Sequence, residues 1–367
     1  MTENRVIGNR VVGAGALRAF SADVLRALGA DTSTAALVAE SLVDADLRGI
    51  DSHGIHLLDL YCTRIGKGQL DPRAVIRVVD DRGSVVHLDG GLGFGQPCGV
   101  RAIDLGIERA REYGIASALA RETTHLGALG YYTRRAAEAG CVALAFQNGP
   151  TIVPPFGSTT PLFSTNPFSY AFPAAEEPPI VFDIATTAVA GNKLLLAKKR
   201  GDPTIPEGWA NDDEGRPTTN TERASVHHLQ WFGGHKGFGI GFLVELMAGV
   251  AAGSSFGRTE DTASPARGGD RVAKGFQFVV IDAERFMPAA ELRARVDTLI
   301  RDVHASAAAD GVDHVYVPGE IEHDTREQRL AEGIPLADGV VDVLNAIASD
   351  VGVPRLFDDT RMAKDRA

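Results

Sequence analysis

The sequence predicts an α/β protein whose helices pack against a β-sheet in layers. Between residues 73 and 190, segments with helical periodicity alternate with short runs rich in β-branched residues, which is the pattern of a layered α/β domain. The 367 residues correspond to two or three domains of about 150 residues each, so the chain can bury a large core. Glycine is unusually frequent: it makes up 41 of the 367 residues, about one in nine, whereas roughly 7% is usual in proteins. The fold has to explain this excess.

Charge and cysteine content restrict the kind of protein. The 37 Lys and Arg against 48 Asp and Glu give a formal net charge of −11. This argues against nucleic acid or an anionic membrane as the main partner, because such a surface needs clustered Lys and Arg. Cys62, Cys98 and Cys141 lie far apart without a CxxC spacing, so we expect no disulfide framework. The first 20 residues hold no apolar signal segment, and we expect a cytoplasmic protein.

The first part of the chain predicts helices. Apolar residues recur at three- and four-residue spacing over residues 16–48, with a glycine break near the middle. Asp31 and Ser33 are candidate caps for the second of these two helices. Residues 56–72 predict a third helix, which ends in a glycine-containing turn.

The middle of the chain predicts the sheet. Its runs of β-branched residues are bounded by Asp and Gly, and amphipathic segments separate several of them. In chain order we expect a β-hairpin over 74–90, a helix over 98–114, a strand over 115–121, a helix over 128–140, and strands over 142–148, 169–174 and 180–185.

The last part of the chain mixes helices with polar loops. The glycine-punctuated segment from residue 237 contains Glu245, so we interpret it as a buried helix rather than a membrane span. In order we expect a basic helix over 192–200, a long surface loop over 201–220, the helix over 237–253, a loop over 257–271, a strand over 275–282, and helices over 289–306 and 341–352.

A glycine cluster between a strand and a helix suggests a dinucleotide-binding turn. Gly91, Gly93 and Gly95 stand in that context, but the G-x-G-x-x-G fingerprint fails because Cys98 occupies the third glycine position. The acidic candidate about twenty residues later, Glu112, ends a helix instead of following a second strand. We therefore favour a tight turn with close backbone packing over a Rossmann site.

One histidine stands in a loop with other reactive side chains. His53 follows Arg48, Asp51 and Ser52 in the segment DLRGIDSHG. A neighbouring hydroxyl and carboxylate can fix the tautomer of an imidazole and tune its pKa, as proton transfer requires. The planar guanidinium of Arg48 suits a substrate carboxylate. A functional and a structural role for His53 both remain open at this point.

A second histidine follows a predicted strand. His125 stands at the start of a helix, where α/β proteins often bind ligands and where helix N-terminal amides can hold an anion. Thr123 and Thr124 could instead cap that helix, and this structural explanation accounts for both threonines equally well.

Lys236 lies among glycines in GGHKGFG, where the backbone can approach a phosphate or ribose closely. A lysine at a helix start is disfavoured by the macrodipole, which strengthens the functional interpretation. His227, His228 and His235 have no Cys or carboxylate at a recognised spacing, so we expect no metal site. The chain also lacks the GxSxG, Walker A and HExxH motifs, which argues against serine hydrolases, P-loop enzymes and zinc proteases.

Seven segments, taken together and in order, resemble one enzyme family. They are DLRGIDSHG, TTHLGALGYY, STNPFSYAFP, FDIATTAVAGNKLLLAKKRGDPTIPEGW, DDEGRPTT, GGHKGFGIGFLVELMAG and VPGEIE. From about residue 16 to residue 350 the chain is similar to the malate/L-lactate dehydrogenase family of the second type. That family also contains sulfolactate and ureidoglycolate dehydrogenases, 2,3-diketogulonate reductase and piperideine-2-carboxylate reductase.

The resemblance implies a fold and a partner. The implied cofactor domain, over 76–284, is a three-layer α/β unit with a mixed sheet that is unrelated to the Rossmann fold. A mainly helical domain is expected from residues 1–75 together with 285–367. The resemblance further implies NAD or NADP as cofactor, a small carboxylate as substrate, and a homodimer.

The resemblance also implies site residues. His53 and His125 correspond to the two histidines from which the proton donor or acceptor comes, and Arg48 and Ser52 correspond to substrate-binding residues. The implied cofactor contacts are Thr165, Asn166, Asp183, Ile184, Ala185, Lys236, Gly319 and Glu320. The chain departs from the usual pattern at Asn148-Gly149, where a serine commonly follows the asparagine, and at His235, which replaces a tyrosine. The choice between NAD and NADP is therefore not transferred.

The activity implied by the resemblance is reversible hydride transfer between a nicotinamide and C2 of a small 2-hydroxy or 2-oxo acid. Reduction of a cyclic imine such as piperideine-2-carboxylate is the alternative reaction, and ureidoglycolate or sulfolactate are alternative substrates. A binding protein that has kept the fold without the activity is a third possibility. His53 and Lys236, whose loss would have favoured this last interpretation, are both present.

Overall fold

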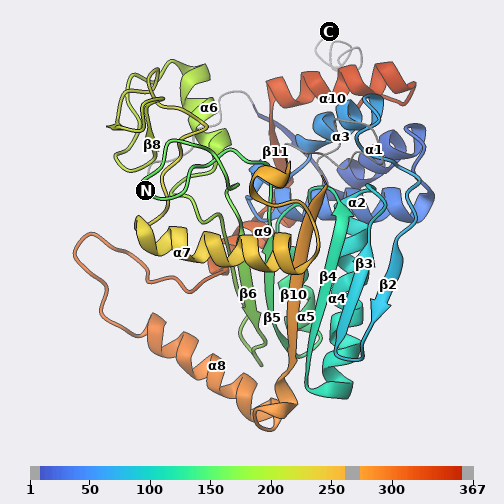
Figure 1. Cartoon of the computed structure of the whole chain (residues 1–367), viewed down its shortest axis with the longest axis vertical. Helices are drawn as coiled ribbons and strands as arrows, with labels where there is room; N and C mark the ends of the chain where they lie inside the picture. Colours follow the sequence, from blue (N-terminus) through green and yellow to red (C-terminus); the bar gives the residue numbers. More distant parts are fainter. Residues whose placement is uncertain (1–8, 261–272, 358–367) are drawn as a thin grey trace. The chain divides into compact units, whose positions relative to one another are not determined.

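The computed structural model describes residues 9–260 and 273–357 (Figure 1). Its contacts divide the chain into two compact units. One unit joins Met1–Ala74 to Glu320–Ala367, and the other is Val75–Gly319. Residues 285–319, which we expected beside the terminal segments, fall in the second unit.

The first unit is mainly helical. Asp31 caps its second helix as expected, because its carboxylate accepts the N–H groups of Ser33 and Thr34. An antiparallel strand pair, absent from the sequence prediction, joins the two stretches of chain that form this unit. The elements are β1 (Asn9–Val12), α1 (Ala14–Ala27), α2 (Thr32–Leu47), α3 (Leu57–Gly66), α9 (Glu320–Glu332), β11 (Ile334–Ala337) and α10 (Asp338–Val351).

The second unit contains a seven-stranded mixed sheet in the order β2-β3-β4-β10-β5-β6-β7. Strands β3 and β4 are parallel, and the other neighbours are antiparallel. The strand of this sheet that comes last in sequence, β10, therefore lies in the middle of the sheet. The strands are β2 (Arg77–Asp81), β3 (Val85–Asp89), β4 (Ile115–Thr123), β5 (Cys141–Gln147), β6 (Phe168–Phe172), β7 (Ile180–Ile184) and β10 (Lys274–Asp282). The predicted hairpin and all the predicted strands of this unit are confirmed.

Helices cover both faces of this sheet (Figure 1). Successive side chains of a strand point to opposite faces. On β5, Ala143 and Ala145 join the core beneath α4 and α5, whereas Leu144 and Phe146 join the core beneath α7 and η2. The covering elements are α4 (Gly95–Tyr113), α5 (Gly130–Glu138), α7 (His235–Val244) and its π-helical continuation η2 (Glu245–Ala251). The unit thus has three layers.

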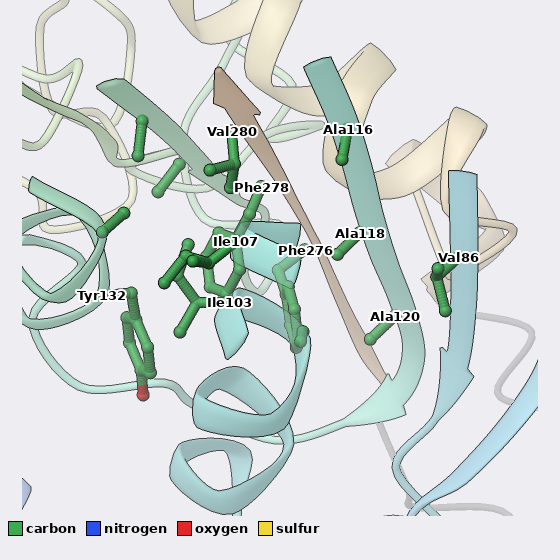
Figure 2. Packing of buried hydrophobic residues seen from close by; sticks show 14 of the residues in the cluster. Val86, Ile103, Ile107, Ala116, Ala118, Ala120, Tyr132, Phe276, Phe278 and Val280 are labelled. Atoms are coloured by element: carbon green, nitrogen blue, oxygen red, sulfur yellow. The ribbon is translucent and has the colours of Figure 1, made fainter. Parts of the chain in front are cut away.

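Large side chains on the central strand fill the core beneath α4 and α5 (Figure 2). Phe276 and Phe278 of β10 stack with centroids 4.8 Å apart, and Tyr132 of α5 stacks on Phe278 at 5.2 Å. The neighbouring strand β4 contributes only small alanines to this core, at 116, 118 and 120. Since each fully buried Phe contributes about 2–3 kcal/mol, these rings anchor the helices to the sheet.

Two expectations about the later segments need correction. The 201–220 segment is not a simple loop: it contains the strand pair β8 (Ala210–Asn211) and β9 (Pro217–Thr218). It also contributes to a small apolar core around Trp231, next to α6 (Gly191–Arg200). The helix expected to be buried is α7 with η2, and one of its faces is exposed. Most of the loop expected over 257–271 lies outside the described residues.

A buried carboxylate attaches α8 (Ala289–His304) to the sheet. Asp297 accepts the backbone N–H groups of Ala175, Glu176 and Glu177, in the β6–β7 loop, at 3.0, 2.9 and 3.4 Å. Arg301, one helical turn later, pairs with the carboxylates of Glu176 and Glu177. These contacts explain why 285–319 belongs to the second unit. Among the helices that the structure describes, none is both long and apolar enough to cross a membrane.

We predict that Asp297→Ala lowers the free energy of unfolding by about 2–3 kcal/mol, because three part-buried backbone N–H groups lose their charged acceptor. The matched control is Asp302→Ala on the same helix, whose exposed side chain should change stability by less than about 0.5 kcal/mol. Urea unfolding followed by circular dichroism measures both variants. Equal stability of the two variants would contradict the role of Asp297.

Candidate functional site

The SHG segment forms a short loop directly after α2. Asp51–His53 makes one 3-10 turn, and the hydroxyl of Ser52 lies 3.0 Å from Nδ1 of His53. This contact ties down Nδ1 and orients the ring. Burial, and to a smaller extent the nearby His56, lowers the pKa of His53 to about 4 from an ordinary value of 6.5. The imidazole is therefore neutral at physiological pH.

Arg48, at the C-terminal end of α2, is oriented by a carboxylate one helical turn earlier. Its Nε lies 3.3 Å from both carboxylate oxygens of Asp44, and each side chain is only 12% exposed. Arg48, Ser52 and His53 thus come from one helix end and the loop that follows it. A substrate carboxylate at Arg48 would share the guanidinium with Asp44.

Two further ionisable residues bind this loop, and the sequence pattern does not single them out. Asp46 accepts the backbone N–H of Ile55 at 2.8 Å, and Arg329 of α9 bonds to Asp51 at 2.6 Å. No periodicity or spacing marks Asp46, because a carboxylate within a helix normally faces water. The glycine of the SHG motif, Gly54, is the one sequence feature that could have indicated a role for Asp46. It has no side chain, which leaves room for the Asp46 carboxyl group.

His125 lies in the irregular connection between β4 and α5. Its Nδ1 accepts the N–H of Gly127 at 3.2 Å, so in the neutral ring the hydrogen is on Nε2. The threonines before it do not cap α5, which begins at Gly130 after Leu129. Their hydroxyls bond to the backbone of other segments: Thr123 donates to the carbonyl of Lys274, and Thr124 donates to the carbonyl of Gly93. The capping alternative is therefore wrong.

The glycine cluster is explained by this same connection. A Cβ on Gly95 would lie 2.5 Å from the carbonyl oxygen of His125 and 2.7 Å from that of Thr124. Gly91 has a φ of 61°, and the N–H of Gly95 bonds to the Thr124 hydroxyl at 3.1 Å. The expectation of a tight turn with close backbone packing is confirmed.

Strand β7 brings together two of the motifs expected to contact a cofactor. Asp183 accepts the N–H of Gly130 at 2.7 Å, which places its carboxylate at the N-terminus of α5. Beside it, the N–H of Val181 bonds to the carbonyl of Pro318 at 3.2 Å. Gly319 follows with a φ of +89°, and a Cβ there would lie 2.7 Å from the Val181 carbonyl oxygen. FDIA and VPG are therefore adjacent. Glu320 is the first residue of α9, in the first unit.

Asn166, which follows Thr165 in the chain, is bonded to α7 and η2. Asn166 is fully buried with a φ of 38°, and its Nδ2 donates to the Gly241 carbonyl and to the Glu245 carboxylate, both at 2.8 Å. Its Oδ1 is buried without a hydrogen-bond partner within residues 9–260 and 273–357. Thr186 donates its hydroxyl to the Thr165 carbonyl at 2.9 Å. The STNP motif is thus fixed to the end of β7 and to α7.

The remaining cofactor candidates lie at the ends of the same elements. Ile184 is the last residue of β7, Ala185 follows it, and both are half-buried. Lys236 stands in the first turn of α7 with an exposed side chain. A cavity of about 180 Å³ adjoins this helix start and is lined by Trp231 and Gly234 among others.

The departure at Asn148-Gly149 has a steric reason. A Cβ on Gly149 would overlap the hydroxyl of Ser164, so this chain has no space for the serine that is common there. The side chain of Asn148 makes two structural hydrogen bonds: it accepts the N–H of Gly275 at 3.0 Å and donates to the Ser255 carbonyl at 2.6 Å.

Within residues 9–260 and 273–357, His227, His228 and His235 are not grouped with other possible metal ligands. Both ring nitrogens of buried His228 face backbone carbonyls, that of Asp212 at 2.8 Å and that of Thr159 at 3.0 Å. His235 lies against the ring of Phe156. His228 therefore serves to hold the 201–231 region together.

Comparisons with known proteins agree with this architecture. The family model described as malate/L-lactate dehydrogenase matches residues 12–345. A malate dehydrogenase of Pyrococcus horikoshii is 34% identical over 348 residues, which cover 93% of this chain and 95% of that protein. The crystal structure of malate dehydrogenase from Entamoeba histolytica matches with a TM-score of 0.89 and 27% identity, over 95% of this chain and 100% of that one.

A third similar protein is named for a different activity. The crystal structure of delta1-piperideine-2-carboxylate reductase from Pseudomonas syringae pvar. tomato matches with a TM-score of 0.81 and 30% identity, over 92% of this chain and 100% of that one. The resemblance inferred from the ordered motifs is confirmed by the family match. The chain belongs to the malate/L-lactate dehydrogenase family.

Proposed function

We propose that the protein is a nicotinamide-dependent oxidoreductase that interconverts a small 2-hydroxy acid of the malate or lactate type and its 2-oxo acid. The observation that carries this proposal is the loop after α2, where an oriented imidazole at His53 lies a few residues from a fixed guanidinium at Arg48. These are the two groups that a 2-hydroxy acid needs, one for its hydroxyl proton and one for its carboxylate.

The residues present fit a nicotinamide cofactor. The buried, unpartnered Oδ1 of Asn166 offers an acceptor for an amide or ribose hydroxyl, and the half-buried backbone of Ile184 and Ala185 offers contact along the sheet edge. Lys236 supplies a cation for a phosphate. Asp183, Thr165, Gly319 and Glu320 complete the proposed contacts. When bound, the cofactor supplies or accepts the hydride. A sheet with one parallel pair supports a cofactor fold other than the Rossmann type.

The chain's own residues manage the substrate and its proton. Arg48 holds the carboxylate, with Ser52 beside it, and the neutral His53 takes the hydroxyl proton as the 2-hydroxy acid is oxidised. In the reverse direction the imidazole of His53 returns the proton to the substrate oxygen. His125 in the second unit is the alternative carrier, and its Nε2–H can donate a hydrogen bond to a substrate oxygen.

Reduction of a cyclic imine that carries a carboxylate is the second candidate function. The similarity to the piperideine-2-carboxylate reductase structure favours it, and the same arginine would bind the carboxylate. Sulfolactate and ureidoglycolate extend the panel of 2-hydroxy acids to be tested.

A substrate panel tests the proposed function. Absorbance of the reduced nicotinamide is followed with NADH and with NADPH, using oxaloacetate, pyruvate, sulfopyruvate and piperideine-2-carboxylate. The proposal expects turnover of a 2-oxo acid, and faster turnover of the imine would select the second candidate. No cofactor oxidation with any of these compounds, by protein that binds NADH or NADPH, would contradict both.

We further propose a homodimer that uses the exposed face of α7 and η2. Between Gly237 and Ala252 the only charged side chain is Glu245, which is buried. A helix that is apolar all round is normally covered. Its exposed stripe, at helical spacing, consists of Phe242, Leu243, Leu246 and Val250. A second copy offers an equally apolar surface across a two-fold axis.

The expected cytoplasmic location stays a prediction.

Replacement of His53 should remove the proton carrier. We expect His53→Ala to lower kcat/KM for 2-hydroxy acid oxidation by about 10²–10⁴-fold. The wild-type enzyme should retain kcat/KM as the pH falls from 7 towards 5, because the pKa of His53 is about 4 and its neutral form is the base. A pH–rate profile checks this. Near wild-type kcat/KM in both His53→Ala and His125→Ala would exclude either histidine as the carrier.

Arg48→Lys should raise KM for the carboxylate substrate and lower kcat/KM by at least about tenfold, since a point ammonium cannot replace the planar fork. Steady-state kinetics with varied substrate and saturating cofactor measures the change. The KM for the cofactor should stay the same, as a control for folding. An unchanged substrate KM together with an unchanged kcat would rule out the carboxylate-binding role.

Leu246→Glu should dissociate the proposed dimer. Leu246 is 43% exposed on the η2 stripe, and Leu299, which is 65% exposed on α8, provides the matched control Leu299→Glu. Size-exclusion chromatography with light scattering should show a dimer for wild type and for Leu299→Glu, and a monomer for Leu246→Glu. A monomeric wild-type protein, or a dimeric Leu246→Glu, would place the interface elsewhere or exclude it.

A further inference from the structure

A buried carboxyl group lies directly under the loop that carries His53. Asp46 is near the end of α2 and is 3% exposed. Its Oδ2 accepts the backbone N–H of Ile55, nine residues later, at 2.8 Å. The end of the helix is thereby bonded to the far side of the Asp51–Gly54 turn. The proton carrier sits between these two attachment points.

The glycine after His53 makes this contact possible. A Cβ built on Gly54 would overlap the carboxyl group of Asp46. The carboxyl group therefore fills the space that a side chain at position 54 would occupy, and it contacts the backbone immediately next to the imidazole. Asp46 and Gly54 are complementary, so a change at either residue displaces the other.

A second link reaches the loop from α9. Arg329 donates Nη1 to the backbone carbonyl of Asp46 and to the carboxylate of Asp51, the latter at 2.6 Å. Its side chain is only 16% exposed. One guanidinium thus joins the helix end to the start of the loop, while the Asp46 carboxyl group joins the same helix end to the loop's far side. The loop is fixed at both ends.

The protonation of Asp46 follows from this environment. Burial raises the pKa of Asp46 to about 8, opposed by the bond from Ile55 and by Arg329 and reinforced by Asp51. On the same helix, Asp44 and Arg48 are paired with each other. At neutral pH the carboxyl group is therefore mostly protonated, and as the pH rises through about 8 it becomes a buried anion beside Asp51.

We propose that Asp46 is a positioning residue, which in its neutral form holds the Gly54–Ile55 backbone so that the half-buried imidazole of His53 stays oriented for proton transfer. This inference rests on the proposed function only in assigning proton transfer to His53. The packing itself concerns the loop and can be measured in the absence of substrate. Ionisation of Asp46 at alkaline pH should loosen the loop, because an unpaired buried charge favours exposure to water.

The titration of His53 provides a test that does not depend on catalysis. Histidine-labelled protein is titrated by NMR, with the His53 signal assigned from its absence in His53→Ala. Wild type should give a pKa near 4, and Asp46→Ala should raise it towards 6.5, because the half-buried ring then becomes more exposed to water. Asp46→Asn, which keeps a neutral acceptor for Ile55, should retain the low value. Asp59→Ala, an exposed carboxylate on α3, is the matched control.

The alkaline range supplies a second readout for the case in which Asp46→Ala does not fold. The His53 signal of wild type should shift again as the pH passes about 8, and this second step should be absent in Asp46→Asn. A low pKa in Asp46→Ala, or an alkaline step that persists in Asp46→Asn, would overturn the proposal. Neither result depends on turnover, so failure here is distinguishable from failure of the proposed reaction.

Discussion

The connection between β4 and α5 is the constraint on which the second unit depends. It has no regular structure of its own, yet side chains from other elements bond to its backbone. Gln147 of β5 receives the N–H of Leu126 and donates to the Thr124 carbonyl, and Tyr132 donates to the Leu126 carbonyl. Asp183 of β7 receives the N–H that opens α5. One irregular loop, which carries His125, is thus linked to three strands that are not neighbours in the sheet: β4, β5 and β7.

In the first unit, the loop after α2 is likewise held by hydrogen bonds from side chains of other segments. Its backbone is held by a carboxyl group and a guanidinium, so that His53 stands on an over-determined loop instead of on a regular element. Rigid loops of this kind suit catalysis, because a proton carrier misplaced by about 1 Å loses much of its rate advantage. The requirement for glycine arises in both places from a neighbour that occupies the space of a side chain, at Gly54 and at Gly95.

The sequence predicted what depends on local pattern. The strands and helices from 74 to 185 and the tight turn at Gly95 follow from periodicity and spacing. The β1–β11 pair escaped prediction because it joins segments more than 300 residues apart. The sequence alone is compatible with Thr124 as a helix cap, because it does not show that the hydroxyl of Thr124 faces the turn at Gly93. The sequence does not predict the roles of Asp46 and Arg329 either, because their burial and their hydrogen-bond partners depend on tertiary packing.

The proposed reaction is direct hydride transfer to C2 of a carboxylate substrate held by Arg48. The most direct measurement uses nicotinamide cofactor stereospecifically deuterated at C4 on each face in turn, with the best 2-oxo acid of the panel. Proton and deuterium NMR of the product should show one deuterium at C2 from one of the two labelled cofactors and none from the other. A product that carries no deuterium from either cofactor, or that carries it elsewhere, would contradict the account.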